Sequence, residues 1–339
     1  MHEGRWGLRR TAPRRYRRAA GLLAALALAA TAACATGSGG DRGTLPGAED
    51  GLQARVQPTG TASAAPPAPS SAAPAKAPSS AAPSSFAPSS SAPAAGPFPR
   101  PRSMAALGDS ITRGFDACSI PLKDCPSKSW ATGDDVDSIA RRLGLPSSAV
   151  FNDARTGARM NDLAGQARTA VGQHVEYVTV LMGANDACRD REDQMTPVSE
   201  FEAQLREGLG VLRNGLPGVR VLLVSVPDVI RLWEVAHGER LARAVWSRGV
   251  CQTALSDPES TKRDDVDRRQ RVRDRVTAYN DVLRRVCAEW PGQCRYDGGA
   301  VNRHKFTKGD LSDWDWFHPS GQGHGIIAKL ASEAGFRWQ

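Results

Sequence analysis

AALGDS, at residues 105–110, is an apolar run that ends abruptly in Gly-Asp-Ser. The run predicts a buried β-strand that carries the hydroxyl of Ser110 at its carboxyl end. In open α/β sheets, ligands bind outside the carboxyl ends of the strands. We therefore expect Ser110 to face a ligand site; the alternative is that it only caps a helix in an ordinary turn.

The sequence around this run alternates strand patterns with helix patterns. Short apolar runs predict strands at residues 104–107, 150–152, 177–182 and 219–226. Longer amphipathic runs predict helices at residues 136–143, 160–171, 198–216 and 266–290, with a last helix after Ser320. This alternation favours an α/β fold, a three-layer α/β/α sandwich with a central parallel sheet. The strand patterns are too few for an eight-stranded barrel.

A candidate base lies far downstream, in the segment Asp315-Trp316-Phe317-His318. A neutral serine hydroxyl is a weak nucleophile and needs a base beside it to remove its proton. His318 is the candidate base, and Asp315 is the candidate carboxylate that orients its imidazole. His304 would be the alternative base only if no acid could orient His318. The aromatic residues beside His318, with Trp314, either line an acyl pocket or pack internally.

Acyl transfer also needs N–H donors for the oxyanion of its intermediate. The candidates are the backbone N–H groups of Ser110 and Gly157 and the side-chain amide of Asn185. Gly157 and Asn185 each follow a predicted strand. All three donors are therefore expected at one edge of the sheet.

Four blocks appear in order: Gly-Asp-Ser, a glycine after the second strand, Gly-x-Asn-Asp after the third, and Asp-x-x-His near the end. Their order and spacing over residues 103–335 resemble the SGNH (GDSL) hydrolase family, with Ile111 where the family usually has Leu. The resemblance implies a flavodoxin-like fold and a carboxylic ester hydrolase that uses neither a cofactor nor a metal. It assigns the nucleophile to Ser110, the base to His318 and the oxyanion hole to Gly157 and Asn185.

Further stretches around Trp130, Asn152 and Gln166 are similar to the phospholipase-B-like branch of this family. That similarity implies a lipid or lysolipid ester as the substrate. The alternatives are a carbohydrate or cell-wall glycan O-deacetylase and a wall-binding lipoprotein without catalysis. The expected partner is a small-molecule or lipid ester, and we expect a monomer.

The N-terminal third has a different composition. Residues 1–34 combine seven arginines, an apolar run at 19–30 and small residues before Cys34, the pattern of a bacterial export signal. Most of the formal net charge of +8 lies in this leader, so the charge does not indicate a nucleic-acid partner. Residues 35–100 are rich in Ala, Pro and Ser, which predicts a disordered linker. The catalytic domain is expected at residues 101–339.

Cys34 follows Thr31-Ala32-Ala33, a sequence that resembles a lipobox with Thr31 in place of the usual Leu. Lipidation of Cys34 would anchor the exported chain to the outer face of the cell membrane. The alternative is ordinary cleavage near Ala33 or Ala35, which would release the chain outside the cell.

Six cysteines lie after the linker. An even number in an exported chain indicates disulfide bonds. We expect sequential pairs, Cys118 with Cys125, Cys188 with Cys251, and Cys287 with Cys294. Zinc is the alternative use, but no C-x-x-C pair is present to supply the usual ligand spacing.

Overall fold

A computed structural model describes residues 97–339 of the chain. Its strands form one parallel sheet in the order β2-β1-β3-β4-β5, the strand order of flavodoxin-like folds. The strands are β1 (Met104–Gly108), β2 (Val150–Asn152), β3 (Tyr177–Leu181), β4 (Arg220–Leu223) and β5 (Cys294–Tyr296). The predicted α/β class and parallel sheet are confirmed. The expected export signal, Cys34 and nearly all of the linker lie outside the described residues.

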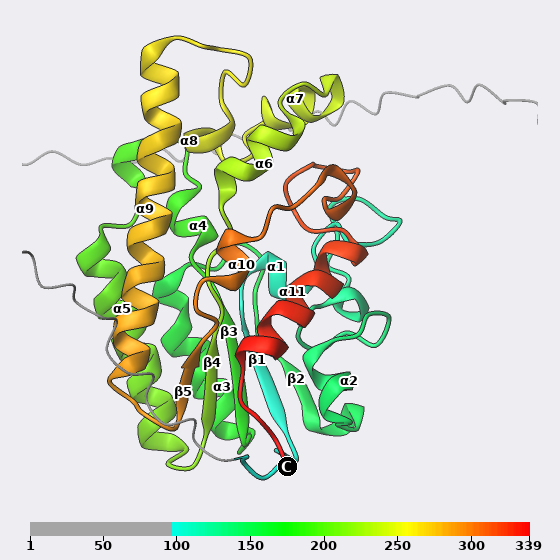
Figure 1. Cartoon of the computed structure of the whole chain (residues 1–339), viewed down its shortest axis with the longest axis vertical. Helices are drawn as coiled ribbons and strands as arrows, with labels where there is room; N and C mark the ends of the chain where they lie inside the picture. The colour runs from blue at the N-terminus through cyan, green and yellow to red at the C-terminus, as the bar shows by residue number, and fades with distance from the viewer. Residues whose placement is uncertain (1–96) are drawn as a thin grey trace, which may run out of the picture. The chain divides into compact units, whose positions relative to one another are not determined.

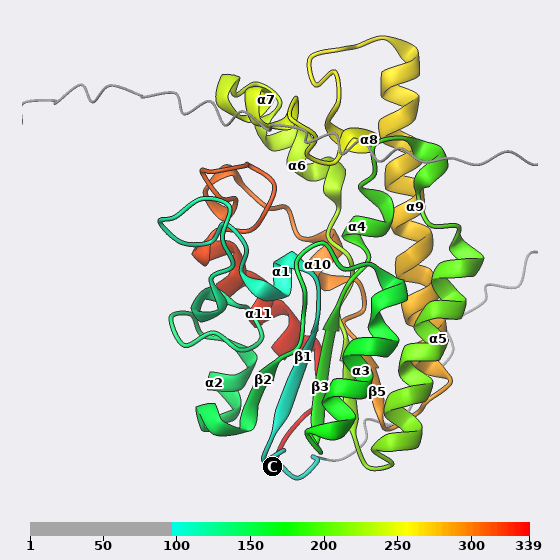
Figure 2. The same cartoon turned by 180° about the vertical axis from the view of Figure 1, so that it is seen from behind.

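Helices cover both faces of this sheet (Figures 1 and 2). They are α1 (Ser110–Arg113), α2 (Ile139–Leu143), α3 (Leu163–Gly172), α4 (Ala184–Ala187), α5 (Val198–Gly215), α6 (Val229–Ala236), α7 (Arg240–Trp246), α8 (Gln252–Leu255), α9 (Arg263–Ala288), α10 (Ala300–Arg303) and α11 (Gly321–Ala334). Helix α3 contacts β1 and α5, and α5 contacts α9, whereas α11 crosses the opposite face and contacts α2. Within residues 97–339, none of the helices has the length and apolarity needed to cross a membrane.

The central strands are buried along their whole length. Every residue of β1 and of β3 is buried, as expected for parallel strands covered by helices on both faces. The two strands pair in register from Met104 opposite Tyr177 to Gly108 opposite Leu181. Their carboxyl ends are therefore level, and α1 and α4 begin from the same edge of the sheet.

The fourth strand is shorter than predicted. The apolar run continues to Val226, but β4 ends at Leu223. The side-chain amide of Asn280, on α9, binds both backbone groups of Val226 at 2.8 and 3.1 Å. Because these backbone groups are occupied by a side chain, the segment leaves the sheet while remaining buried.

Two parts of the fold were not predicted. Strand β5 has only three residues, Cys-Arg-Tyr, which form no apolar run. The Cys287–Cys294 disulfide joins it to α9. The segment between β4 and α9 contains α6, α7 and α8, which lie above the carboxyl edge of the sheet (Figure 1).

The packed domain begins slightly earlier than expected. Phe98 falls in the predicted linker, but its ring packs edge-on against Phe336 at 5.5 Å. Its backbone also exchanges hydrogen bonds with Arg337 and Gln339 at 2.8 Å each. Phe98 therefore packs with the C-terminal segment of the described residues.

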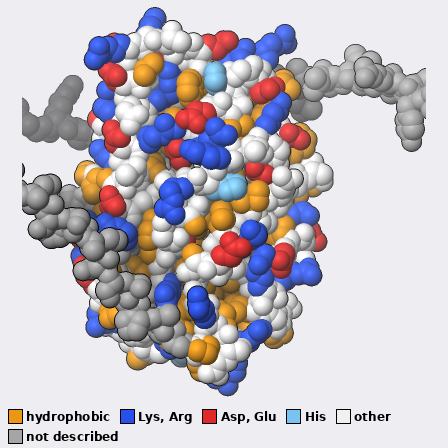
Figure 3. Space-filling model, in the orientation of Figure 1, with side chains coloured by type: hydrophobic (Ala, Val, Ile, Leu, Met, Phe, Trp, Pro, Cys, Tyr) orange, Lys and Arg blue, Asp and Glu red, His pale blue; other side chains and the backbone are white. Residues whose placement is uncertain are grey.

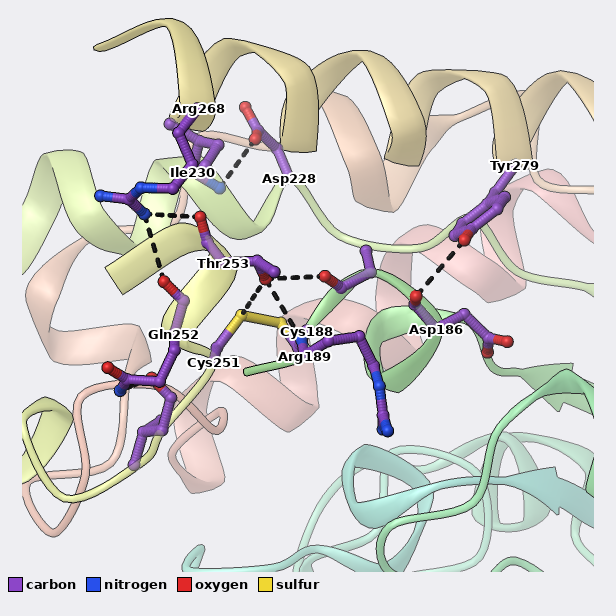
Figure 4. The surroundings of a disulfide bond; sticks show 12 residues. Asp186, Cys188, Arg189, Asp228, Ile230, Cys251, Gln252, Thr253, Arg268 and Tyr279 are labelled. Carbon is purple, nitrogen blue, oxygen red and sulfur yellow. Dashed lines mark hydrogen bonds between the residues drawn. A yellow bond between two sulfur atoms is a disulfide. The ribbon is translucent and has the colours of Figure 1, made fainter. Parts of the chain in front are cut away.

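All three predicted cysteine pairs are present as disulfides. The Cys188–Cys251 bond ties the end of α4 to the α6–α8 segment across 63 residues. Beside it, the Thr253 hydroxyl donates to the Ala187 carbonyl at 2.7 Å and accepts from the Arg189 N–H at 3.2 Å (Figure 4). The α6–α8 segment is thus fastened to the edge of the sheet by a covalent bond and by hydrogen bonds.

The surface of the domain carries both signs of charge. Figure 3 shows Lys and Arg interspersed with Asp and Glu over the face drawn in Figure 1. This mixture differs from the basic stripe that proteins use to follow a nucleic-acid backbone.

Candidate active site

Ser110 lies at the sharp turn between β1 and α1. Gly108 has a φ of +155°, and a Cβ there would lie 2.4 Å from the Leu181 carbonyl oxygen, so only glycine fits between the two strands. The buried side chain of Gln166 binds both the N–H and the carbonyl of Gly108, at 2.8 and 2.9 Å. Asp109 then caps α1 by accepting from the Ile111 N–H at 2.9 Å. These contacts set the direction in which Ser110 leaves the sheet.

The structure brings the three candidate triad residues together. The Nε2 of His318 lies 2.8 Å from the Ser110 Oγ, although the two residues are 208 positions apart in the chain. The Nδ1 of the same ring lies 2.5 Å from the Asp315 Oδ2. With Nδ1 protonated, His318 donates to Asp315 and leaves Nε2 free to accept from the serine hydroxyl. His304 instead packs edge-on against Phe306.

Asp315 is held by backbone and side-chain donors. Its Oδ1 accepts from the N–H groups of Phe317 and His318 at 2.9 and 3.0 Å. The buried indole of Trp246, on α7, donates to the Asp315 carbonyl oxygen at 2.9 Å. Sequence reasoning missed Trp246, because its role depends on a contact between residues 69 positions apart.

The electrostatics of the site favour a basic His318. Burial alone would lower the pKa of the imidazole, but the carboxylate of Asp315, with Asp109 and Asp116 farther away, outweighs burial and raises it. Burial would likewise raise the pKa of Asp315, and His318 with the backbone donors lowers it instead. Asp315 therefore favours its ionised form, which would stabilise an imidazolium at His318.

Asp116 is a second carboxylate beside the imidazole that the sequence did not indicate. Ligand atoms of Asp116, Asp315 and His318 all lie within 4.8 Å of one another. Burial and the nearby Asp315 raise the pKa of Asp116. Both ring nitrogens of His318 already have hydrogen-bonding partners, Asp315 at Nδ1 and Ser110 at Nε2.

The segment that holds Gly157 is tied to α4. The side-chain amide of Asn185 donates to the Ala158 carbonyl at 2.9 Å. The next residue, the buried Asp186, accepts from the Met160 N–H at 3.0 Å. Asn185 and Asp186 thus hold the backbone at residues 158 and 160, just after Gly157. Gly157 is exposed, has a φ of +82° and has open space around the position of a Cβ.

Two hollows meet at Phe317, the residue before His318. An open cleft of about 600 Å³ is lined by His318, Asn185, the Cys188–Cys251 disulfide and Arg248. A narrower pocket has an almost wholly apolar lining, made of Ile111, Ala184, Pro227, Val229, Leu232, Phe306, Leu311, Phe317 and Pro319. Phe317 lines both hollows. An ester at Ser110 would therefore lie between a narrow apolar pocket and an open cleft.

Comparison with known proteins places the chain in a family. Residues 104–331 match the family described as GDSL-like Lipase/Acylhydrolase. The chain is 27% identical over 173 residues to membrane-associated phospholipase B1 of Mus musculus, an alignment that covers 39% of this chain and 12% of that protein. The chain thus spans about an eighth of the length of this relative.

Solved structures show distant likenesses. One is a catalytic mutant of an acetylxylan esterase from Geobacillus stearothermophilus, with 19% identity and a TM-score of 0.44, covering 70% of this chain and 95% of that one. Another is phospholipase A1 from Streptomyces albidoflavus, with 18% identity and a TM-score of 0.43, covering 69% of this chain and 100% of that one. By its match to the family over residues 104–331, this chain belongs to the GDSL-like lipase/acylhydrolase family and is a carboxylic ester hydrolase.

Proposed function

We propose that this chain is an exported serine esterase that cleaves lipid or small acyl esters through an acyl-enzyme intermediate. The observation that carries the proposal is the continuous hydrogen-bonded line from the Ser110 hydroxyl through His318 to Asp315, at 2.8 and 2.5 Å. A serine activated in this way is suited to attack an ester carbonyl.

The proposed reaction has two halves. Ser110 Oγ bonds to the ester carbonyl carbon while its proton moves to the Nε2 of His318. The imidazolium then gives that proton to the departing alcohol, which leaves the acyl group on Ser110. In the second half, His318 takes a proton from a water that attacks the acyl carbon, and the acid is released.

The developing oxyanion needs donors on the far side of the carbonyl. The N–H of Ser110 lies in the first turn of α1, where a helix offers it no acceptor. We assign the other two donors to the Gly157 N–H and the Asn185 side chain, whose second amide hydrogen is not used in its bond to Ala158.

The apolar pocket is the proposed acyl site. Aliphatic side chains of α1, α4 and α6 surround it together with Phe306 and Phe317, so methylene groups placed there would leave water. Its volume is about 20 Å³, close to the space that one water molecule needs, so a chain longer than acetyl enters only where the walls move apart. The apolar lining favours a longer acyl group and the small volume favours acetyl, and the substrate series below distinguishes the two.

Export and anchoring are further parts of this proposal. Three disulfides within residues 97–339 suit an oxidising compartment, as does the export signal expected at 1–34. We propose that the domain is tethered through the linker to a lipidated Cys34. The intact mass of the mature N-terminus tests this, and a mass without diacylglycerol would exclude the anchor.

The test of the catalytic proposal is hydrolysis of p-nitrophenyl esters of increasing chain length, set beside acetylated xylan. We expect turnover that rises beyond acetate and that Ser110→Ala reduces by about 10³-fold or more. Activity confined to acetyl groups would favour the deacetylase. Full turnover by Ser110→Ala would exclude Ser110 as the nucleophile. An unmodified chain without esterase activity would favour a non-catalytic wall-binding protein.

A further inference from the structure

The exposed apolar side chains of the domain gather around the mouth of the open cleft. Five large hydrophobic residues are exposed among residues 97–339: Ile120 (52%), Leu122 (82%), Leu241 (66%), Val266 (48%) and Trp314 (42%). Isolated exposed hydrophobic residues are normal in soluble proteins, but contiguous ones mark binding surfaces. All of these except Val266 are connected to the cleft, as the next two paragraphs describe.

The loop from Gly114 to Cys125 carries two of them. It is closed by the Cys118–Cys125 disulfide, and its tip presents Ile120 and Leu122. Leu122 lines the cleft and has a φ of +57°, a conformation that is uncommon for a bulky residue without a reason. The loop thus holds a large apolar side chain out in water at a conformational cost.

The other two lie on neighbouring elements. Trp314 lines the cleft, and its indole N–H donates to the Cys118 carbonyl at 2.8 Å, which joins it to the loop. Leu241 stands one turn before Val245 on α7, so the two share a helix face, and Val245 also lines the cleft. We call Ile120, Leu122, Trp314 and Leu241 the apolar rim.

Hydrogen bonds hold the loop part of the apolar rim in place. The Asp116 carboxylate accepts from the Leu122 N–H at 2.5 Å, and the Asp116 carbonyl accepts from the Ser312 hydroxyl at 2.6 Å. The Ser312 hydroxyl in turn accepts from the Trp314 N–H at 3.2 Å. These bonds connect the exposed tip to the loop that carries His318, so the tip keeps its position relative to the site.

The charges at the rim fit a phosphate-bearing surface. Lys123 and Arg248 are exposed beside it, and neither makes an ion pair with any residue in the described range. Two exposed carboxylates, Asp135 and Asp313, line the neighbouring hollow, and Asp135 is paired with Lys128 at 3.4 Å. Apolar side chains flanked by cations are the combination that holds a protein in the interfacial layer of a membrane.

We propose that the apolar rim docks on a lipid surface and so brings the cleft onto aggregated ester substrate. This inference rests on the proposed function for its purpose, but the docking itself is independent of Ser110. A second copy of the chain is the competing occupant, and it would close the cleft that the rim surrounds.

The experiment uses a local reporter, so that anchoring elsewhere in the chain does not decide it. The full chain with Cys34→Ser and Ser110→Ala receives Leu122→Cys or, as the matched control, Val266→Cys, and each is labelled with an environment-sensitive fluorophore. The probe is vesicles of phosphatidylcholine, alone and with phosphatidylglycerol. We expect a blue shift of the label at position 122 and none at 266, with tighter binding when phosphatidylglycerol is present.

Truncation of the rim provides the second measurement. Ile120→Ser and Leu241→Ser, neither of which lines the cleft, should each raise the lipid concentration at half-maximal signal about tenfold, whereas Val266→Ser should leave it unchanged. An unresponsive label at 122, equal responses at both positions, or a response to protein concentration without lipid would each overturn the proposal. Hydrolysis of a soluble ester by the chain with Ser110 intact is measured alongside; its absence would refute the esterase and leave the docking result standing.

Discussion

Asp116→Asn tests whether the second carboxylate sets the proton affinity of His318. The asparagine is nearly isosteric and keeps an oxygen for the N–H of Leu122, which donates to Asp116 at 2.5 Å. The substitution therefore removes one negative charge and leaves the loop in place. Ligand atoms of Asp116 and His318 lie within 4.8 Å of each other, which sets the scale of the effect.

Coulomb's law gives the magnitude. At the upper limit of that separation, 4.8 Å, two unit charges interact by about 0.9 kcal/mol in a water-like medium and by about 3.5 kcal/mol at an effective dielectric constant of about 20. Because both residues border an open cleft, we expect Asp116→Asn to destabilise the protonated form of His318 by about 1 kcal/mol, near the smaller of these energies.

The direction follows from the charges that face the imidazole. Asp315 on its own loop, Asp109 before α1 and Asp116 all raise the pKa of His318, while His324 is neutral, because burial lowers its pKa to about 3. Removing one carboxylate destabilises the imidazolium. The pKa of His318 therefore falls, and the acid limb of kcat/KM, which reports the free base, moves to lower pH.

The assay is the pH profile of kcat/KM for a soluble p-nitrophenyl ester. Asp313→Asn is the control, since Asp313 is an exposed carboxylate on the same loop as His318 and lies outside the group of ligand atoms around the imidazole. An acid limb that stays in place in Asp116→Asn, or that moves to higher pH, would refute the electrostatic reasoning.

Three further outcomes are expected. Asp315→Asn should lower kcat by about 10³- to 10⁴-fold, because an amide N–H facing Nδ1 favours the His318 tautomer that cannot accept from Ser110. Circular dichroism should show that the variant is still folded. A loss of kcat below tenfold would count against the triad. His324 is fully buried, neither of its ring nitrogens has a partner among the described residues, and burial lowers its pKa to about 3. The unfolded chain therefore binds a proton at His324 that the folded chain does not, and the folded state loses stability as the pH falls from about 6.5. In denaturant titrations, His324→Leu should increase the free energy of unfolding by about 2 kcal/mol more at pH 5 than at pH 7. Replacing Cys188 and Cys251 by Ser should lower the free energy of unfolding by about 4 kcal/mol, and replacing Cys118 and Cys125 should lower it by about 2.5 kcal/mol. The difference arises because the loops that these disulfides close span 63 and 7 residues. Equal losses would contradict a loop-entropy origin.

Local sequence patterns predicted the elements whose residues are buried with a regular period. The strands at 104–107 and 177–182 and the helices at 198–216 and 266–290 correspond closely to β1, β3, α5 and α9. The prediction was less accurate where a side chain replaced the backbone as hydrogen-bonding partner. At 219–226 the apolar pattern continues after the strand has ended, because Asn280 binds the backbone of Val226.

The placement of the candidate site could be predicted from the expected parallel sheet. Ser110, Gly157 and Asn185 each follow a strand, and parallel strands bring their carboxyl ends to one edge. Asp116 and Trp246 were not predictable, because neither follows a strand or belongs to a spaced motif. Each acts through a contact with the loop that carries His318, and a contact of this kind leaves no pattern in a single sequence.

In the proposed enzyme, catalysis and substrate choice are carried by different parts of the chain. Ser110 and His318 come from the turn after β1 and from the loop before α11, whereas Val229, Leu232 and Arg248 of the hollows come from the α6–α8 segment. That segment is fastened at two points, by the Cys188–Cys251 disulfide and by the Trp246 indole on the Asp315 carbonyl. Changes elsewhere in this segment can therefore alter the pocket walls while the serine, the imidazole and the carboxylate keep their distances. Loss of either fastening would instead disturb the walls and the orienting carboxylate together.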